Sequence, residues 1–242
     1  MRISAEALVI LVALVFYLYD SLMLLAVNEA VLELGLDGFW NPAFGSNRWK
    51  IGGKEPYVPN PFLPHLQTYR LKWRMSVSDG EQLTSEPLHP PPELVRLVPF
   101  VYLSGICMFM LVPIGLFINV GAYFLPSAIA LMYLNNLAAL VVLWRIRTAV
   151  SLPSAEFYSV AFECVACPPF AVNLIRKLSR RIVCGEDFMS ASKRLLQDEQ
   201  LTRVNSDCLL RVDEQIDFAP EDSATMEELK ALRINMQPDD IK

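Results

Sequence analysis

Three long apolar segments, almost free of charge, are the strongest constraint on how this chain folds. Residues 7–27 include one charged side chain, Asp20, and residues 98–120 and 122–144 include none. About 20 apolar residues in a helix are needed to cross the ~30 Å hydrocarbon core of a bilayer, and backbone polar groups in lipid must be satisfied within the helix itself. The sequence therefore predicts a mainly α membrane protein with three transmembrane helices, one N-terminal and two forming a helical hairpin.

The basic residues predict the orientation of these helices. Arg2 alone precedes the first apolar segment, and the other 20 Lys and Arg residues lie outside all three segments, between Arg48 and Lys242. Because Lys and Arg collect on the cytoplasmic side, we expect the N-terminus outside, the C-terminus in the cytoplasm, and a multi-pass protein of the bacterial inner membrane. An alternative topology makes residues 157–175 a fourth span, which would bury Glu163 in lipid.

On this topology the chain divides into five regions. Residues 1–27 are the first transmembrane helix, which we expect to continue as a helix to about Leu36, with Glu29, Glu33 and Asp37 on its solvated face. Residues 28–97 form a cytoplasmic loop with a small β unit and a proline-rich linker, and residues 98–144 are the transmembrane helical hairpin. Residues 145–185 are a basic juxtamembrane segment lying on the membrane surface, and residues 186–242 are an acidic, helical cytoplasmic tail.

The 28–97 loop carries a strand pattern with basic residues on one side. Residues 69–77 alternate strictly between apolar and polar side chains, which is typical of a half-buried strand, and residues 48–51 repeat the alternation before a Gly52-Gly53 turn. The basic face of the predicted sheet consists of Arg48, Lys50, Arg70, Lys72 and Arg74. This face suits anionic lipid headgroups or an acidic protein partner, whereas the acidic balance of the whole chain, with a pI of about 5.2, argues against nucleic acid.

The tail from Glu186 to Lys242 has 14 acidic and 7 basic residues and still carries an apolar stripe at helical spacing. Such a stripe needs a cover. The sequence leaves two covers open: the strand unit of the 28–97 loop, or another protein.

Asp20 is the first candidate functional residue, because a carboxylate at the centre of a bilayer costs roughly 2.5–3.5 kcal/mol and normally has a partner or a task. Asn135 and Asn136 fall at a similar depth of the third predicted span. We therefore expect a hydrogen bond from Asp20 to one of them, acting as polar glue between helices. The alternatives are contact with a partner's helix and a proton or ion relay, although relays usually need several ionisable groups in series.

Four cysteines outside the predicted spans are the second candidate site. Cys164, Cys167, Cys184 and Cys208 could supply four thiolates to a zinc ion, but their spacing lacks the second close pair that makes such sites convincing. A redox role for the Cys164/Cys167 pair needs a lowered thiol pKa, which the adjacent Glu163 opposes. We expect these thiols to be packed as small apolar residues, and we expect no cofactor.

These observations favour a non-enzymatic membrane protein that anchors or scaffolds partners, or assists assembly of a complex, through cytoplasmic surfaces. The expected partners are anionic lipids and either another protein or a second copy of this chain. One alternative is a small transport or channel subunit that uses Asp20. A further alternative is a metal or redox sensor built on Cys164 and Cys167. The common phosphate-binding, zinc-protease and serine-hydrolase motifs are missing from the sequence.

Overall fold

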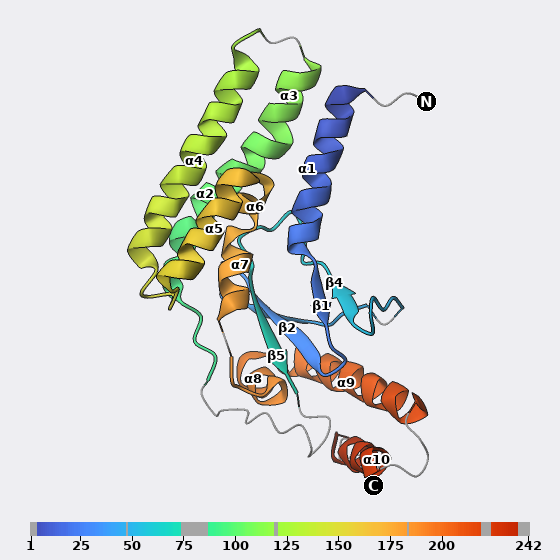
Figure 1. The fold of residues 1–242 in the computed structure, drawn as a ribbon. Helices are drawn as coiled ribbons and strands as arrows, with labels where there is room; N and C mark the ends of the chain where they lie inside the picture. The colour runs from blue at the N-terminus through green and yellow to red at the C-terminus, as the bar shows by residue number, and fades with distance from the viewer. Residues whose placement is uncertain are drawn as a thin grey trace.

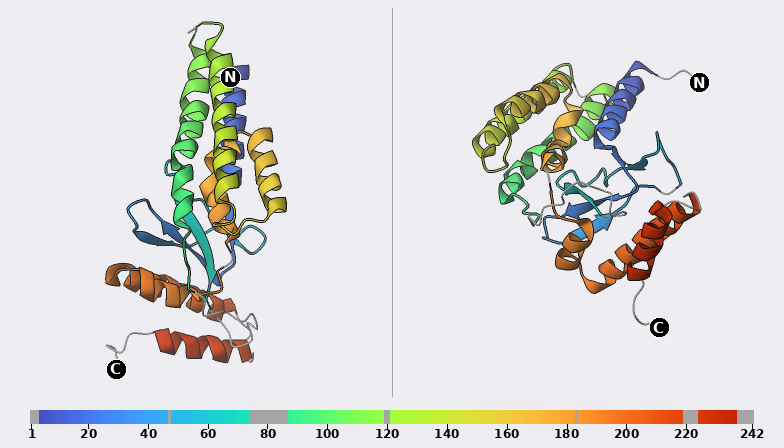
Figure 2. Two further views of the ribbon diagram at one scale, coloured as in Figure 1. Left: turned by 90° about the vertical axis from the view of Figure 1, so that its left-hand side faces the viewer. Right: turned by 60° about the horizontal axis from the view of Figure 1, so that its bottom comes forward.

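The computed structural model describes residues 4–46, 48–73, 87–118, 121–182, 184–218 and 224–236. The described chain is mostly helical with a small β region. A bundle of helices forms one end of the molecule, the strands lie beneath it, and three further helices, α8 to α10, close the other end (Figure 1). Figure 2 shows the same layers from two further directions.

Two helices of the bundle are long and apolar enough to cross a membrane. The first runs over Pro92–Phe117 and the second over Phe124–Ile146. The first begins as a 3₁₀ turn, η1 (Pro92–Leu97), and continues as α2 (Val98–Ile106), a π-helical turn η2 (Cys107–Leu111) and α3 (Val112–Phe117). The π turn ends two residues before Pro113, whose ring and missing N–H disturb the hydrogen bonds of the preceding turn.

The second long helix, α4 (Phe124–Ile146), packs antiparallel to the first and shares a buried core with it. Pro126 lies in its first turn, where a missing N–H leaves no broken hydrogen bond. The helix begins at Phe124 rather than at residue 122, where the predicted span starts. The turn of the predicted helical hairpin, between residues 117 and 124, falls partly outside the described residues.

The expectation of three transmembrane helices is not supported, because the N-terminal helix is too short. Helix α1 (Ala5–Ser21) has 17 residues, which gives a length of about 26 Å. Leu22 has extended backbone angles, and the chain continues as a strand from Met23. The apolar run to Val27 is therefore only partly helical. A short apolar run without a charge does not distinguish a helix end from a buried strand.

The predicted helical extension to Leu36 is wrong. Residues 23–34 form strands β1 (Met23–Leu25) and β2 (Glu29–Leu34). Glu29 is buried, and Glu33 accepts a hydrogen bond from the Tyr57 hydroxyl at 2.6 Å. The acidic residues of β2 are thus paired inside the fold and do not form a solvated helix face.

The β region consists of two small antiparallel sheets. Strand β1 pairs with β4 (Glu55–Tyr57), and the three-stranded sheet has the order β3 (Trp40–Ala43), β2, β5 (Gln67–Lys72). In β5 and just beyond it, Tyr69, Leu71 and Trp73 are buried and Arg70 is exposed. The predicted alternation is therefore confirmed as far as Trp73, and residues 74–77 lie outside the described chain.

The acidic tail supplies the cover for one face of this sheet. Helices α8 (Phe188–Leu195) and α9 (Asp198–Phe218) bring Phe188, Val204 and Cys208 against Tyr69 and Trp73 in one buried cluster. Helix α10 (Ala224–Met236) packs on α9. The sequence leaves open whether the strand unit or another protein covers the apolar stripe of the tail. In the structure the strand unit covers it for α8 and α9.

The segment expected on the membrane surface packs into the helix bundle instead. It forms α5 (Ser154–Ala166), α6 (Pro169–Val172) and α7 (Leu174–Arg181). In Figure 1, α5 rises beside α4, and the chain returns to the sheet through α6 and α7. Pro168 and Pro169 break the helix at this reversal, because proline cannot continue a helix but fits its first turn. Helix α7 therefore lies between the bundle and the sheet.

Candidate functional site

The two asparagines predicted to bind Asp20 have other partners. Asn135 donates to the Ser104 hydroxyl at 2.8 Å and to the Phe100 carbonyl at 2.9 Å. The amide oxygen of Asn136 accepts from Ser104 at 2.7 Å, and its nitrogen donates to the Cys164 carbonyl at 3.4 Å. These bonds join α2, α4 and α5. The predicted bond to Asp20 is wrong, because α1 packs on α6 and α3 rather than on α4.

Asp20 instead pairs with a lysine that the sequence assigns to the membrane surface. The Asp20 Oδ1 atom lies 2.8 Å from Nζ of Lys177, and the same nitrogen lies 2.6 Å from Oε2 of Glu163. The side chains of Asp20 and Lys177 are 10% and 11% exposed, whereas that of Glu163 is 33% exposed. Lys177 also lies over the Phe170 ring, 4.3 Å from its centroid. One buried cation thus joins a buried and a half-exposed carboxylate.

One oxygen of this network has no partner. Asp20 Oδ2 is fully buried and makes no hydrogen bond in the described structure. An unpaired buried oxygen on an ionised group is costly, and such groups concentrate at functional sites. Asp20 therefore combines one well-paired oxygen with one unpaired oxygen, and Arg176 Nε in the same region is likewise buried without a hydrogen bond in the described structure.

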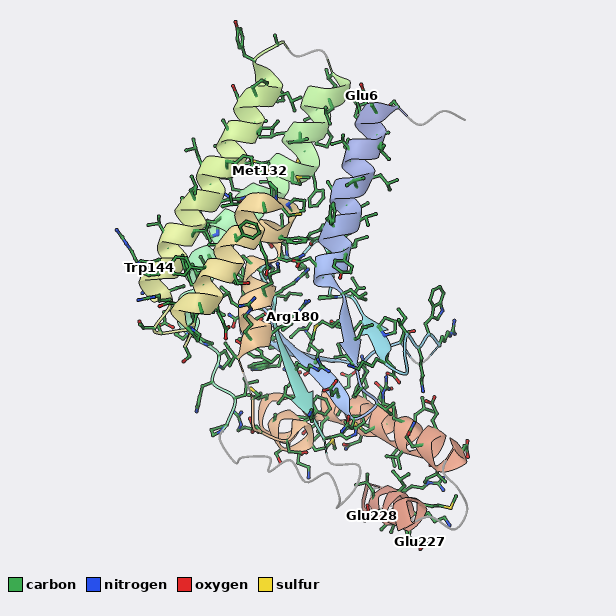
Figure 3. The ribbon with its side chains drawn as sticks, viewed as in Figure 1. Glu6, Met132, Trp144, Arg180, Glu227 and Glu228 are labelled. Carbon is green, nitrogen blue, oxygen red and sulfur yellow. The ribbon has the colours of Figure 1, made fainter. Side chains whose placement is uncertain are left out.

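Arg180 caps the end of α1. Its guanidinium donates to the main-chain oxygens of Asp20 at 3.1 Å and Ser21 at 2.6 Å, and to Thr68 Oγ1 on β5 at 3.3 Å. These carbonyls belong to the last turn of α1, which lacks intrahelical donors. Burial and the nearby Arg176 lower the pKa of Arg180 to about 10, so the side chain remains charged at neutral pH. Figure 3 shows Arg180 between the helices and the strands.

Arg176 is fully buried and is held by neutral oxygens. It donates to the carbonyls of Asn60 and Leu63 and to the amide oxygen of Asn173. Asn173 in turn donates to the Tyr17 carbonyl at 3.1 Å and accepts from the Ser21 hydroxyl at 3.1 Å. These bonds tie α7 to α1 and to the loop that follows β4.

We refer to Asp20, Ser21, Glu163, Asn173, Arg176, Lys177 and Arg180 as the junction cluster. Sequence reasoning missed it, because Arg176, Lys177 and Arg180 were assigned to lipid headgroups. Arg181, the next residue after Arg180, lies at the surface, where its Nη1 atom is 3.3 Å from Oε2 of Glu156. The sequence signal that could have indicated this cluster is the spacing of residues 173, 176, 177 and 180, which places their side chains on one helix face.

The four cysteines do not come together. Cys164 is buried in the helix-bundle core, and Cys208 is buried between the sheet and α9, with Cys184 packed against that same cluster. All five cysteines of the chain are free thiols. Burial raises the pKa of Cys184 to about 11, which disfavours the reactive thiolate. Among the described residues, no group of three or more His, Cys, Asp or Glu side chains could hold a metal ion.

The predicted basic face is divided between separate parts of the β region. Arg48 and Lys50 lie in the hairpin between β3 and β4, whereas Arg70 and Lys72 lie on β5. Arg70 forms an ion pair with Glu29 on β2, and β2 separates β5 from β3 in the sheet. Arg74 is outside the described residues. Of the predicted basic face, the part that remains together and exposed is therefore the pair Arg48 and Lys50 in the hairpin.

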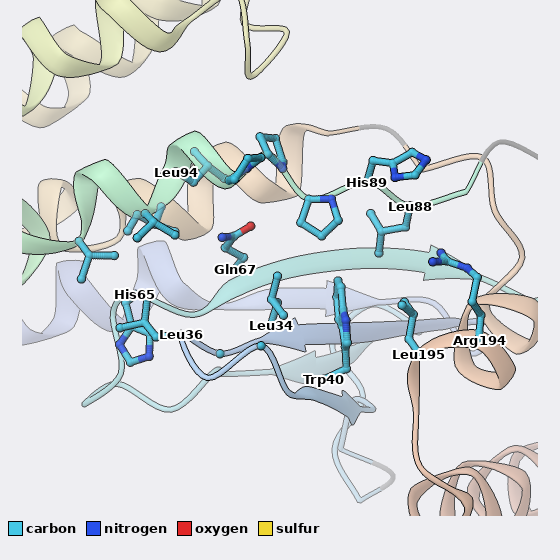
Figure 4. A pocket seen from close by; sticks show the side chains of 18 residues that line it. Leu34, Leu36, Trp40, His65, Gln67, Leu88, His89, Leu94, Arg194 and Leu195 are labelled. Carbon is cyan, nitrogen blue, oxygen red and sulfur yellow. The ribbon is translucent and has the colours of Figure 1, made fainter.

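A cavity of about 450 Å³ lies between the sheet and the segment that enters the first long helix. Figure 4 shows Trp40 and Leu34 on one wall and Leu94 and His89 on the other. Its lining is mostly apolar. Arg194 at one end is already paired with Glu186 at 2.8 Å, and His65 contacts the Tyr102 hydroxyl at 2.5 Å. His89 is exposed, and the described residues that line the cavity include no Asp or Glu.

Comparison with known protein families, with curated proteins and with solved structures finds no match to this chain.

Proposed function

We propose that this protein is a non-enzymatic membrane scaffold that holds its β region and helices α8–α10 in a fixed orientation against the membrane. The observation that carries this proposal is the junction cluster. Arg176, Arg180 and Asn173 fasten α7 to α1 and to the loop after β4, and Arg180 also reaches β5. Buried polar bonds of this kind are directional, so they resist rotation of one layer on the other.

In the proposed topology α2–α3 and α4 cross the bacterial inner membrane, and α1 inserts beside them. Most of the apolar side chains of α1 are exposed, among them Leu8, Val12 and Phe16, which suits a helix in contact with lipid. Its N-terminal end lies at the same end of the bundle as the end of α3 and the start of α4 (Figure 1). The strands and tail helices are then cytoplasmic.

The partner surface that we propose is the exposed side of α9 that α10 leaves open. This helix carries six acidic and two basic residues, and one of the basic residues, Arg211, is buried against the sheet. Asp207, Leu210, Glu214 and Asp217 recur at helical spacing, and Leu210 is half exposed. Charge complementarity favours a basic partner.

The experiment is quantitative recovery of bound proteins with the full-length chain in mild detergent. Neutralising Asp207, Glu214 and Asp217 to the corresponding amides should reduce recovery of a stoichiometric partner at least tenfold. The matched control neutralises Glu6, Asp37 and Glu93, three acids away from α9, and should leave recovery unchanged. Equal recovery with both variants contradicts the proposed surface. Deleting the whole tail is not a valid test, because α8 and α9 cover the sheet core.

A small transport subunit is the second candidate, and two observations favour it. Asp20 has an unpartnered buried oxygen, and Lys177 links it to the half-exposed Glu163. The network thus supplies the ionisable groups in series that a proton or ion relay needs. Purified protein in liposomes should then conduct protons, Asp20→Asn should abolish the flux, and the surface variant Glu156→Gln should keep it. No flux above empty liposomes for the native protein contradicts this candidate.

A further inference from the structure

The hairpin between β3 and β4 presents a compact group of aromatic, aliphatic and basic side chains. Its tip is Arg48-Trp49-Lys50-Ile51-Gly52-Gly53-Lys54, which has three cations and no acid. Gly52 and Gly53 have φ of 58° and 77°, and Ile51 and Lys54 exchange backbone hydrogen bonds of 2.8 and 3.1 Å. Two consecutive positive φ angles favour glycine and close a tight two-residue turn. The tip is therefore a defined structure.

The tip exposes apolar surface that the other described parts of the chain leave uncovered. The side chains of Trp49 and Ile51 are 72% and 52% exposed. Single exposed apolar residues are ordinary, but here two of them alternate with cations along seven residues. Arg48, Lys50 and Lys54 form no ion pair with any described residue. The hairpin is thus both apolar and positively charged.

The base of the hairpin is fixed close to the inner end of α1. Strand β4 follows the tip directly and pairs with β1, with Glu55 opposite Leu25, and β1 begins two residues after α1 ends. Three residues of strand span roughly 10 Å. Buried Arg211 of α9 holds the same base, because it lies 2.7 Å from Glu55 Oε2. The hairpin projects sideways beneath the helices (Figure 1).

The loop that follows β4 rises further toward the bundle. The Tyr17 hydroxyl, one turn before the end of α1, donates to the Pro61 carbonyl at 2.5 Å. The next residue, Phe62, has an 84% exposed side chain. A largely exposed apolar ring therefore directly follows the residue that contacts α1, and it lies on the chain segment between the hairpin and the bundle.

We infer that the hairpin tip binds the anionic headgroups of the adjacent leaflet. This inference rests on the proposed insertion of the helices. The headgroup layer is about 5–8 Å thick and the surface potential extends about 8–10 Å beyond it, which together exceed the roughly 10 Å of strand between the end of α1 and the base of the hairpin. Trp is favoured at that interface, and each Lys or Arg near an anionic surface strengthens binding by about fivefold.

The test is quenching of tryptophan fluorescence by brominated lipids in nanodiscs that contain the full-length protein. Trp49→Phe should remove one quenchable component. Trp144→Phe is the internal reference, because Trp144 lies at the sheet-proximal end of α4 (Figure 3) and reports insertion of the bundle. Quenching of Trp49 should increase from neutral to phosphatidylglycerol-containing nanodiscs. The triple variant Arg48→Gln, Lys50→Gln, Lys54→Gln should lose that increase while the Trp144 component stays constant.

Three outcomes overturn the inference in distinguishable ways. If Trp144 is quenched and Trp49 is not, the bundle is inserted but the hairpin is not an anchor. If Trp49 is quenched equally in neutral and anionic nanodiscs, the cations do not recognise headgroup charge. If neither tryptophan is quenched, the proposed membrane insertion fails together with the anchor.

Discussion

Lys177→Met removes the cation that two carboxylates share, while it keeps the aliphatic stem of the side chain. Asp20, whose side chain is 10% exposed and already has one unpaired oxygen, then loses its counterion. Removing one partner of a buried ion pair costs about 3–5 kcal/mol. For a chain of this size 1 kcal/mol corresponds to about 2–4 °C in the unfolding temperature. We expect Lys177→Met to lower that temperature by roughly 6–20 °C.

Glu163 provides the control for this prediction, because its side chain is more exposed than that of Asp20. The Glu163 side chain is 33% exposed, so solvent screens its pair with Lys177 and Glu163→Gln should cost no more than about 1 kcal/mol. Asp20→Asn combined with Lys177→Met should cost less than the sum of the two single changes, because the amide needs no counterion.

The assay is thermal unfolding of the purified protein in detergent, followed by helical circular dichroism, for the native chain and the four variants. Equal, small losses for Lys177→Met and Glu163→Gln would refute the reasoning, since the burial of Asp20 would then not determine the energy. A double variant that is additive within about 0.5 kcal/mol would show that Asp20 and Lys177 do not interact.

The remaining predictions concern the β region. Arg211→Met should lower the free energy of unfolding by about 3–5 kcal/mol, because it leaves the buried carboxylate of Glu55 without its partner at 2.7 Å; joint replacement of Glu55 by Gln should recover part of this loss in the same melting assay. Gly45→Ala should prevent accumulation of folded protein, because the added Cβ would lie 2.3 Å from the Glu55 Cβ; limited proteolysis checks this, and a native-like protease pattern contradicts it. Cys184 should be alkylated at pH 8 about 100-fold more slowly than an unperturbed thiol, because its pKa is about 11 instead of 9.0. Its alkylation rate should increase about tenfold per pH unit until that pKa, and a rate independent of pH would contradict the assignment.

The sequence by itself determined the elements that depend on local pattern. Charge-free runs long enough to cross a bilayer identified the two long helices, because the cost of burying charge in lipid acts on each residue separately. Strict alternation identified strand β5, and the Gly52-Gly53 pair identified the turn between β3 and β4, because both depend on backbone geometry within a few residues.

Tertiary structure decided the points at which one local pattern fits two folds. Glu29, Glu33 and Asp37 recur every four residues, and a spacing of four keeps side chains on one face of a helix and on one side of a strand. The sequence therefore supports both, and the pairing of β2 with β3 and β5 selects the strand.

The partner of Asp20 was decided in the same way. Depth in the membrane favoured Asn135, but the reversal at Pro168 and Pro169 places α7 against α1. Lys177 then satisfies Asp20 more strongly than an amide, because a buried carboxylate gains most from an opposite charge within hydrogen-bond distance.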